Sequence, residues 1–194
     1  MVTDDNTLIK KAQRGDMQAF EELIYKYDRH VLNIAKSFRN NEDDAKDIYQ
    51  EVFMRVFRGL KNFQFKSEFS TWLFRITTNV CITFENKKKR HVHDSINREI
   101  SSDDEEGGAT LADFIQGEGE TDSLAVGSDL SKHINKALET LPGQQKMVFT
   151  LKYYQDYKIR EIAKMMQCAE GTVKRYLFTA TNKMREQLKG VFEV

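Results

Sequence analysis

A strongly acidic segment divides this chain of 194 residues into two blocks. Residues 94–129 contain 11 acidic residues and one basic residue, a net charge of −10, and they hold five of the ten glycines. A segment of this composition cannot bury enough apolar surface to fold alone. The flanking blocks hold few residues that interrupt helices. The sequence therefore predicts two small helical domains, at 1–93 and 130–194, joined by an acidic flexible linker at 94–129, within which only the apolar run 111–115 offers a docking segment.

Apolar residues recur at every third or fourth position in both blocks, which is typical of amphipathic helices. In the first block this spacing predicts a loop over 60–70 and helices over 18–38, 43–59 and 71–88, with Phe57 on the buried side of the second helix. In the second block it predicts helices over 130–140, 142–154, 158–166 and 172–189. No segment has the alternating pattern of a strand, so the predicted fold class is all-α.

The charge balance excludes a uniformly basic, histone-like protein, because 30 basic and 30 acidic residues cancel. The two blocks are nevertheless basic, with net charges of +4 and +6, and such blocks suit nucleic acid as a partner. No catalytic, metal or cofactor site is predicted, since Cys81 and Cys168 lie far apart and no phosphate-loop, nucleophile-elbow or zinc-protease motif occurs. With no signal peptide and no apolar run longer than three residues, a cytoplasmic protein that does not enter a membrane is expected.

The segment 158–188 has the spacing of a helix-turn-helix unit. Ile159, Ile162 and Ala163 form the buried side of a short helix, a turn follows at 167–171, and a longer helix begins near Thr172. In such a unit the first helix braces the second, which enters the major groove of DNA. The side chains on the groove side would be Glu170, Thr172, Lys174, Arg175, Phe178, Thr179 and Lys183. The alternative is an ordinary helical hairpin with a solvated basic face.

The first block offers a second possible nucleic-acid site. Aromatic residues in and beside the 60–72 segment precede a helix that ends in four consecutive cations at 87–90. Aromatic faces stack on unpaired bases, and a basic groove follows the phosphate backbone. The alternative is that Trp72 belongs to the core and that the cations are solvated. Likewise, the polar face formed by Asp43, Asp44, Asp47, Gln50 and Glu51 suits a basic partner or is simply solvated.

Both blocks resemble the conserved regions of a bacterial RNA polymerase sigma factor of the compact extracytoplasmic-function (ECF) type. The segments DIYQEVFMRVF at 47–57 and FSTWLFRITTN at 69–79 resemble region two of that family. The segments LPGQQ at 141–145, IREIA at 159–163 and GTVKR at 171–175 resemble region four. The resemblance covers 18–90 and 130–188, and the length leaves no room for the extra regions of primary sigma factors. It implies an all-α, two-domain protein that is not an enzyme but directs core RNA polymerase to promoters.

The resemblance also implies roles for particular residues. Core polymerase would be bound by Asp47, Gln50 and Glu51. The melted downstream (minus-ten) promoter element, with one base flipped out, would be bound by Phe63, Phe65, Ser67, Phe69, Ser70, Thr71, Trp72, Arg75, Asn79, Lys87, Lys88, Lys89 and Arg90. The groove-side residues of the helix-turn-helix unit would read the upstream (minus-thirty-five) element. A sequestering anti-sigma factor would wedge between the two domains, and the linker would thread polymerase channels.

One segment departs from the pattern of the family. Where members usually carry more arginines just after the position of Phe178, this chain has TATN at 179–182. Fewer phosphate contacts predict weaker binding of the upstream element and a weaker salt dependence. Two other functions stay open at this point: a stand-alone helix-turn-helix regulator that binds palindromic DNA as a dimer, and a small helical interaction protein without any effect on promoters.

Overall fold

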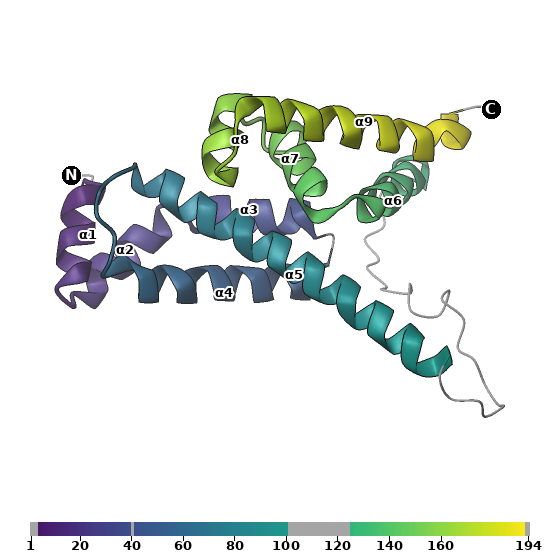
Figure 1. Ribbon diagram of the computed structural model, residues 1–194. Coiled ribbons are helices and arrows are strands. Elements are labelled where there is room, and N and C mark those ends of the chain that lie inside the picture. Colours follow the sequence, from purple (N-terminus) through teal and green to yellow (C-terminus); the bar gives the residue numbers. More distant parts are fainter. Residues whose placement is uncertain (1–3, 40, 101–124, 193–194) are drawn as a thin grey trace.

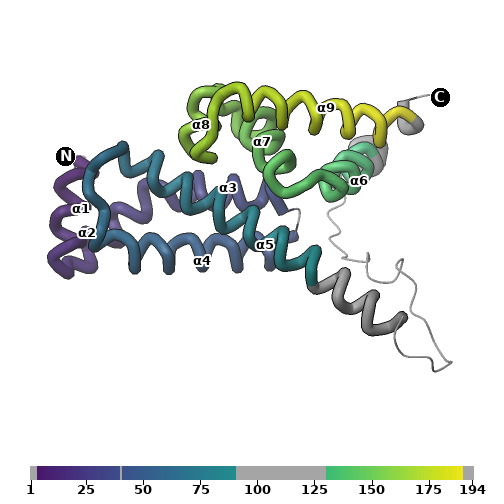
Figure 2. The backbone as a smooth tube through the Cα atoms, viewed as in Figure 1, coloured from purple at the N-terminus to yellow at the C-terminus, as the bar shows by residue number. Residues whose placement is uncertain are grey.

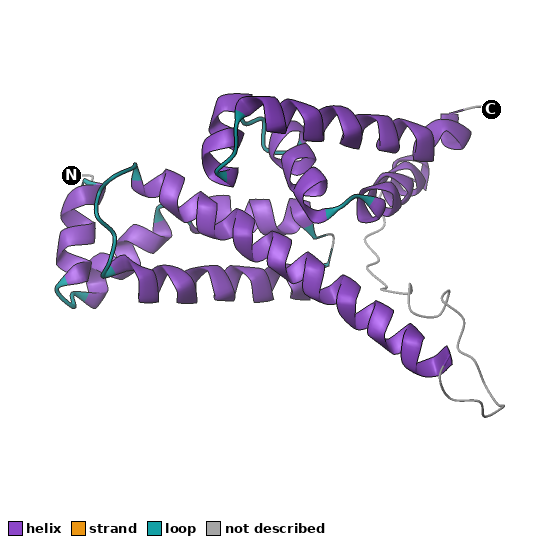
Figure 3. Ribbon diagram, in the orientation of Figure 1, coloured by secondary structure: helices purple, strands orange, loops and turns teal. Residues whose placement is uncertain are grey.

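The structure is a computed structural model that describes residues 4–39, 41–100 and 125–192, with side chains over 4–39, 41–90 and 130–189. Within these residues every regular element is an α-helix and none is a strand (Figure 3). The all-α prediction is therefore confirmed for the part of the chain that the structure describes.

Within each block the helices follow one another with short connections (Figure 1). The first block contains α1 (Asp5–Gln13), α2 (Met17–Tyr25), α3 (Asp28–Phe38), α4 (Glu42–Leu60) and α5 (Phe69–Ile100). The second block contains α6 (Ala125–Thr140), α7 (Gly143–Tyr153), α8 (Ile159–Met166) and α9 (Glu170–Phe192).

Side-chain caps and acidic first turns mark where several helices begin. The Asn41 side chain accepts hydrogen bonds from the backbone N–H groups of Asp43 and Asp44 at the start of α4, at 2.9 and 3.0 Å. Asp16 accepts one from Ala19 in the same way at the start of α2, at 3.1 Å. These bonds satisfy donors that a helix leaves free at its N-terminus, and acidic residues there also suit the helix dipole.

The single helix predicted over 18–38 is wrong: the structure has two helices, α2 and α3, that separate at Lys26 and Tyr27. Both side chains turn toward Asp5 of α1, a helix that was not among the predicted elements. Lys26 Nζ lies 2.6 Å from Asp5 Oδ1, and the Tyr27 hydroxyl donates to Asp5 Oδ2. A tertiary contact with α1 thus accompanies the break that helix periodicity alone did not predict.

The helices also extend into the predicted linker at 94–129. Helical backbone reaches Ile100 at the end of α5 and begins again at Ala125 in α6. No glycine or proline lies between residue 90 and Gly107, so nothing in the local sequence stops α5 after the cationic run. The remaining linker, including the candidate docking run 111–115, lies outside the described residues.

The two blocks pack against each other instead of standing apart. In Figure 2, α7 and α8 lie across α3 and α5, and α9 runs along the side of α7 and α8 away from the first block. One continuous set of buried apolar side chains draws on both blocks, including Leu23, Ile48, Val52, Leu73, Met147, Leu151 and Ile162. A smaller set joins α6 to α9, and it consists of Ala137, Leu138, Leu141, Ala180 and Met184. The relative arrangement of the blocks, which the sequence left undecided, is closed in this structure.

Candidate nucleic-acid interface

The outer face of α4 carries the residues to which the family resemblance gave a role in polymerase binding. Asp47 and Gln50 are exposed, and Glu51 is partly exposed with its Oε1 atom 2.7 Å from Arg55 Nε. Ile48, Val52 and Val56 form the buried side of the same helix, which fixes the direction of the polar face. This face is therefore presented to solvent by a helix that is firmly packed behind it.

Two apolar side chains extend this polar face, and sequence reasoning missed both. Met54 and Phe57 are about half exposed, although the periodicity had placed Phe57 on the buried side. The Phe57 ring is in edge contact with Phe20 of α2, at 5.2 Å between centroids. Because α2 covers only one side of this ring, the α4 surface combines carboxylate, amide and apolar groups, a mixture typical of protein-protein interfaces.

The loop between α4 and α5 divides its aromatic residues between core and surface. Phe63 and Phe69 are only 7% and 4% exposed, and their ring centroids lie 5.1 and 5.7 Å from that of Trp72. These two rings are core residues in this structure, because they fill the space between α4, α5 and Tyr27. Phe65, by contrast, is exposed and has a φ of +56°. Of the rings predicted to stack on bases, Phe65 is the accessible one and Trp72 is half-buried.

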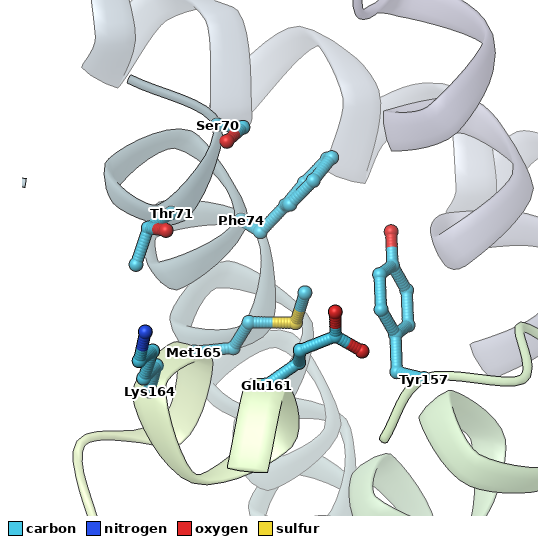
Figure 4. Close-up of a pocket in the computed structure, with 7 residues that line it drawn as sticks. All are labelled: Ser70, Thr71, Phe74, Tyr157, Glu161, Lys164 and Met165. Carbon is cyan, nitrogen blue, oxygen red and sulfur yellow. The ribbon is translucent and has the colours of Figure 1, made fainter. Parts of the chain in front are cut away.

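The first turns of α5 place several predicted DNA contacts opposite the second block. Ser70 and Thr71 line a groove of about 220 Å³ whose other wall is formed by Glu161, Lys164 and Met165 of α8 (Figure 4). Two turns further along α5, the Thr78 hydroxyl donates to the carbonyl oxygen of Met165 at 3.3 Å. Ser67 is partly buried in the loop before the helix, and Asn79 is exposed. The side of α5 that carries Ser70 and Thr71 therefore faces α8.

Arg75 lies in the same region of α5. Its Nε atom is buried without a hydrogen-bond partner among the described residues. An unpaired buried donor is costly, so a group that accepted a hydrogen bond there would be favoured.

Two of the four cations at 87–90 make contacts within the protein, and the other two are exposed. Lys88 Nζ lies 3.1 Å from Asp44 Oδ2. Lys89 Nζ donates to the carbonyl oxygens of Leu141 and Glu139, at 2.9 and 3.2 Å. Lys87 and Arg90 are exposed. One member of the run thus holds the turn between α6 and α7, a contact between the blocks that residue spacing does not reveal.

The helix-turn-helix unit forms as predicted, with its groove side open. Val173, Ala180 and Met184 are buried, which turns the opposite side of α9 outward. Glu170, Lys174, Arg175 and Lys183 are exposed, Phe178 is 70% exposed, and Thr172 and Thr179 are partly exposed. The turn before α9 contains Gln167 at a φ of +51°, the conformation that commonly ends a helix, here α8.

A group of charged side chains is buried where the blocks meet. The carboxylate of Glu85 in α5 lies 2.5 Å from Arg39, 3.2 Å from Lys89 and 3.7 Å from Lys146 of α7. Burial raises the pKa of Glu85, but the attraction of Lys146, Arg39 and Lys89 outweighs it, and the net pKa lies below the ordinary value. For Lys146, burial lowers the pKa more than Glu85 raises it. The sequence does not indicate that these charged residues meet. The position of Lys146 directly before the apolar run 147–149 could have suggested that this lysine is buried.

Sequence reasoning also passed over α1. Gln13 at its end donates from Nε2 to the carbonyl oxygens of Leu60 and Phe63, both at 2.9 Å. The spacing of Leu8, Ile9 and Ala12 could have indicated this helix.

Metal-binding clusters and membrane-spanning helices are absent from the described residues. No group of three or more His, Cys, Asp or Glu side chains there is placed to hold a metal ion. None of the described helices is long and apolar enough to cross a membrane.

Comparison with known families gives two matches that together follow the two blocks. The model of sigma-70 region 2 matches residues 23–91, and the model of sigma-70 region 4 matches residues 132–184. The chain is 30% identical over 182 residues to the ECF RNA polymerase sigma factor SigW of Bacillus subtilis, covering 93% of this chain and 95% of SigW. It is 29% identical over 188 residues to the RNA polymerase sigma-H factor of Pseudomonas aeruginosa, covering 95% and 94% of the two chains.

Two solved structures share the fold. The sigma factor RpoE from Bartonella quintana, in complex with the anti-sigma factor NepR, has a TM-score of 0.58 at 24% identity and covers 88% of this chain and 96% of its own. CnrH, in complex with the cytosolic domain of CnrY, has a TM-score of 0.61 at 21% identity and covers 96% and 97%. Matches along almost the whole chain favour a sigma factor over a stand-alone helix-turn-helix regulator. The chain belongs to the ECF family of RNA polymerase sigma factors, which bind core RNA polymerase and direct it to promoters.

Proposed function

We propose that this sigma factor uses three surfaces, one for core polymerase and two for promoter DNA. The observation that supports this most strongly is the exposure of polar residues on α4 and of cations on α9, each within a block that matches a sigma-70 region. The boundaries of the functional domains would be 1–93 and 130–194, with 94–129 between them.

Core polymerase would bind the outer face of α4. Asp47, Gln50 and Glu51 supply acceptors for a basic partner, and Met54 and Phe57 supply apolar contact area beside them. Interface cores are commonly rich in Met and aromatic residues with a polar rim, which this surface reproduces. The contact would need little rearrangement, because the opposite side of α4 is already buried.

The downstream element would bind along the loop before α5 and along α5 itself. Phe65 offers an exposed ring for a base, while Ser67, Ser70, Thr71, Asn79 and Arg75 offer polar groups. Lys87, Lys88, Lys89 and Arg90 would follow the phosphates, while the buried rings of Phe63 and Phe69 and the half-buried ring of Trp72 support the loop from behind. Extruding a base into this region would favour the melted strand over the duplex.

The upstream element would bind the groove side of α9. Lys174 and Arg175 can donate to guanine or phosphate, and Phe178 can contact a thymine methyl group. Glu170, Thr172, Thr179 and Lys183 complete this surface. With TATN at 179–182, it carries fewer cations than the family pattern, and weak salt dependence is the expected consequence.

Use of both elements would require the two blocks to separate. The elements lie about two turns of DNA apart, roughly 70 Å, whereas in the closed structure α8 packs directly on α5. The contacts between the blocks include polar ones that water can replace, such as the hydrogen bond of 2.8 Å from Gln155 Nε2 to Ser37 Oγ. The acidic linker would permit this separation and would occupy polymerase channels.

The protein would act in the cytoplasm and would have no catalytic activity of its own. A sequestering anti-sigma factor is part of the proposal, since the similar RpoE fold was solved in complex with the anti-sigma factor NepR. It would bind where the two blocks meet.

Run-off transcription with purified core polymerase tests the proposal. Addition of the chain should produce initiation at a subset of promoters that core polymerase alone does not use. A dimeric regulator would instead bind palindromic duplex without polymerase, and an interaction protein would leave initiation unchanged. Either of these results would overturn the proposal.

A further inference from the structure

Helix α1 makes a specific contact with the loop that the proposed function assigns to the downstream element. Gln13, the last residue of α1, donates two hydrogen bonds of 2.9 Å from one side-chain nitrogen to the carbonyl oxygens of Leu60 and Phe63. Leu60 is the last residue of α4. Gln13 is separated along the chain by 47 positions from Leu60 and by 50 positions from Phe63. The contact is therefore tertiary and spans both ends of the turn at 61–62.

The carbonyl groups of Leu60 and Phe63 lie at and just beyond the end of α4, where helix hydrogen bonds run out. The last carbonyl groups of a helix have no partner within it, and Leu60 O otherwise accepts only from Phe63 N, at 3.0 Å, among the backbone bonds of the turn. A single Gln amide can serve both oxygens because it carries two N–H donors. Gln13 thus fixes the direction in which the chain leaves α4.

The loop that follows has a conformation that its surroundings must maintain. Phe65 has a φ of +56°, which is uncommon for a residue with a bulky side chain. Its ring lies 5.1 Å from that of Phe63, and Lys10 of α1 places its Nζ atom 5.9 Å from the ring centroid. Lys10 and Gln13 are three residues apart in one helix, so both can face the loop.

We propose that Gln13 is a positioning residue for the downstream element: through Leu60 O and Phe63 O it holds the 61–68 loop in the shape that receives the melted strand. Lys10 supports the same loop through Phe65. The inference rests on the proposed function, and it adds α1, which lies outside the matched region at 23–91, to the promoter-binding apparatus.

The test uses holoenzyme assembled from core polymerase and the full chain. The probe is a fork-junction DNA with an unpaired downstream element, taken from a promoter at which the wild-type holoenzyme initiates in run-off transcription. Gln13→Met keeps the length of the side chain but removes both donors, and it should weaken binding of the forked probe about tenfold. Gln13→Lys keeps a donor that can reach the carbonyl groups, and it should restore most of that affinity.

Two further measurements separate positioning from a general loss of structure. Affinity for core polymerase and for a duplex that carries only the upstream element should be unchanged in Gln13→Met, because α4 and α9 present those surfaces. Gln18→Met is the matched control, since Gln18 is an exposed residue of α2, and it should bind the forked probe like the wild type. Equal losses on all three ligands would overturn the positioning role in favour of misfolding.

Failure of the inference and failure of the proposed function give different results. Phe65→Ala removes the exposed ring of the loop itself. If Phe65→Ala weakens binding of the forked probe while Gln13→Met matches the wild type, the loop binds the strand but Gln13 does not position it. If both variants match the wild type, the assignment of the loop to the downstream element is itself wrong.

Discussion

Lys146 of α7 and Glu85 of α5 form a buried ion pair between the two blocks, with 3.7 Å between Nζ and Oε2 and with exposed fractions of only 3% and 2%. Arg39 donates to the same carboxylate oxygen at 2.5 Å. The Lys146 ammonium group also lies 5.0 Å from the ring centroid of Phe38. One carboxylate thus connects a cation of its own block to a cation of the other block.

Removal of the anion should be far more harmful than removal of the cation from α7. Glu85→Ala leaves Lys146 buried without its carboxylate, and loss of one partner of a buried pair costs about 3–5 kcal/mol. Lys146→Met keeps an apolar stem of similar length, and the carboxylate retains Arg39 and Lys89, so the loss of stability should be below about 1.5 kcal/mol. Chemical denaturation of the two variants measures this asymmetry, and equal losses would contradict it.

The closed arrangement should open when the chain binds polymerase. Spin labels on cysteines introduced at the exposed residues Asn62 and Lys183 report the separation of the blocks, in a background with Cys168→Ser and with Cys81 buried. We expect a single distance population in the free chain and a shift to longer distances after core polymerase is added, because the proposed promoter elements lie roughly 70 Å apart. An unchanged distance distribution would mean that the blocks do not separate.

Replacement of the polar groups on α4 should weaken polymerase binding without unfolding the chain. Gln50→Ala with Glu51→Ala removes side chains outside the core, so the free energy of unfolding should change by less than about 0.5 kcal/mol. Competition with the wild-type chain for core polymerase measures the effect. Glu186→Ala with Gln187→Ala is the matched control on exposed positions of α9, and similar competition by both double variants would exclude this face as the docking surface.

Replacement of the cations on the groove side of α9 should reduce use of the upstream element. Lys174→Ala with Arg175→Ala should cost about 1–3 kcal/mol for each base contact that is lost, and the cost should depend on the sequence of the element. Binding to a series of upstream-element variants measures this dependence. Arg185→Ala with Lys189→Ala removes two exposed cations of the same helix beyond the groove side and serves as the control. A uniform loss on every sequence would mean that Lys174 and Arg175 contact only phosphates.

Acid should destabilise the fold through three carboxyl groups. Burial raises the pKa values of Asp5, Asp44 and Glu85, but their cationic and hydrogen-bonding partners lower them further, so each net pKa is below its ordinary value. A carboxyl group whose pKa is depressed in the folded state stabilises that state above its unfolded pKa, and this contribution is lost as the pH falls through the folded pKa. The free energy of unfolding should therefore be steady above about pH 5 and should fall below about pH 4. A constant free energy of unfolding from pH 6 to pH 3 would contradict the assigned ion pairs.

Much of the local structure could be predicted from the sequence, because helix periodicity is a property of neighbouring residues. The spacing of Ile159, Ile162 and Ala163 helped to predict the helix-turn-helix unit, and the side of α9 opposite its buried residues is indeed exposed. The same reasoning failed between Tyr25 and Asp28, where contacts of Lys26 and Tyr27 with Asp5 accompany a break within a continuous apolar stripe. It also failed for Phe57, since periodicity does not reveal that α2 covers only part of that ring.

The sequence by itself determined most of the helices, the polar face of α4 and the outward side of α9, because each depends on residues within a few turns of one another. Only the tertiary structure decided that α8 covers the first turns of α5, that Lys89 holds the carbonyl groups of Leu141 and Glu139, and that Gln13 serves Leu60 and Phe63. These contacts join residues about 50 or more positions apart, and burial of shared apolar surface together with pairing of buried polar groups selects them. The spacing of residues along the chain does not show which distant residues will meet, so the closed arrangement became evident only from the tertiary structure.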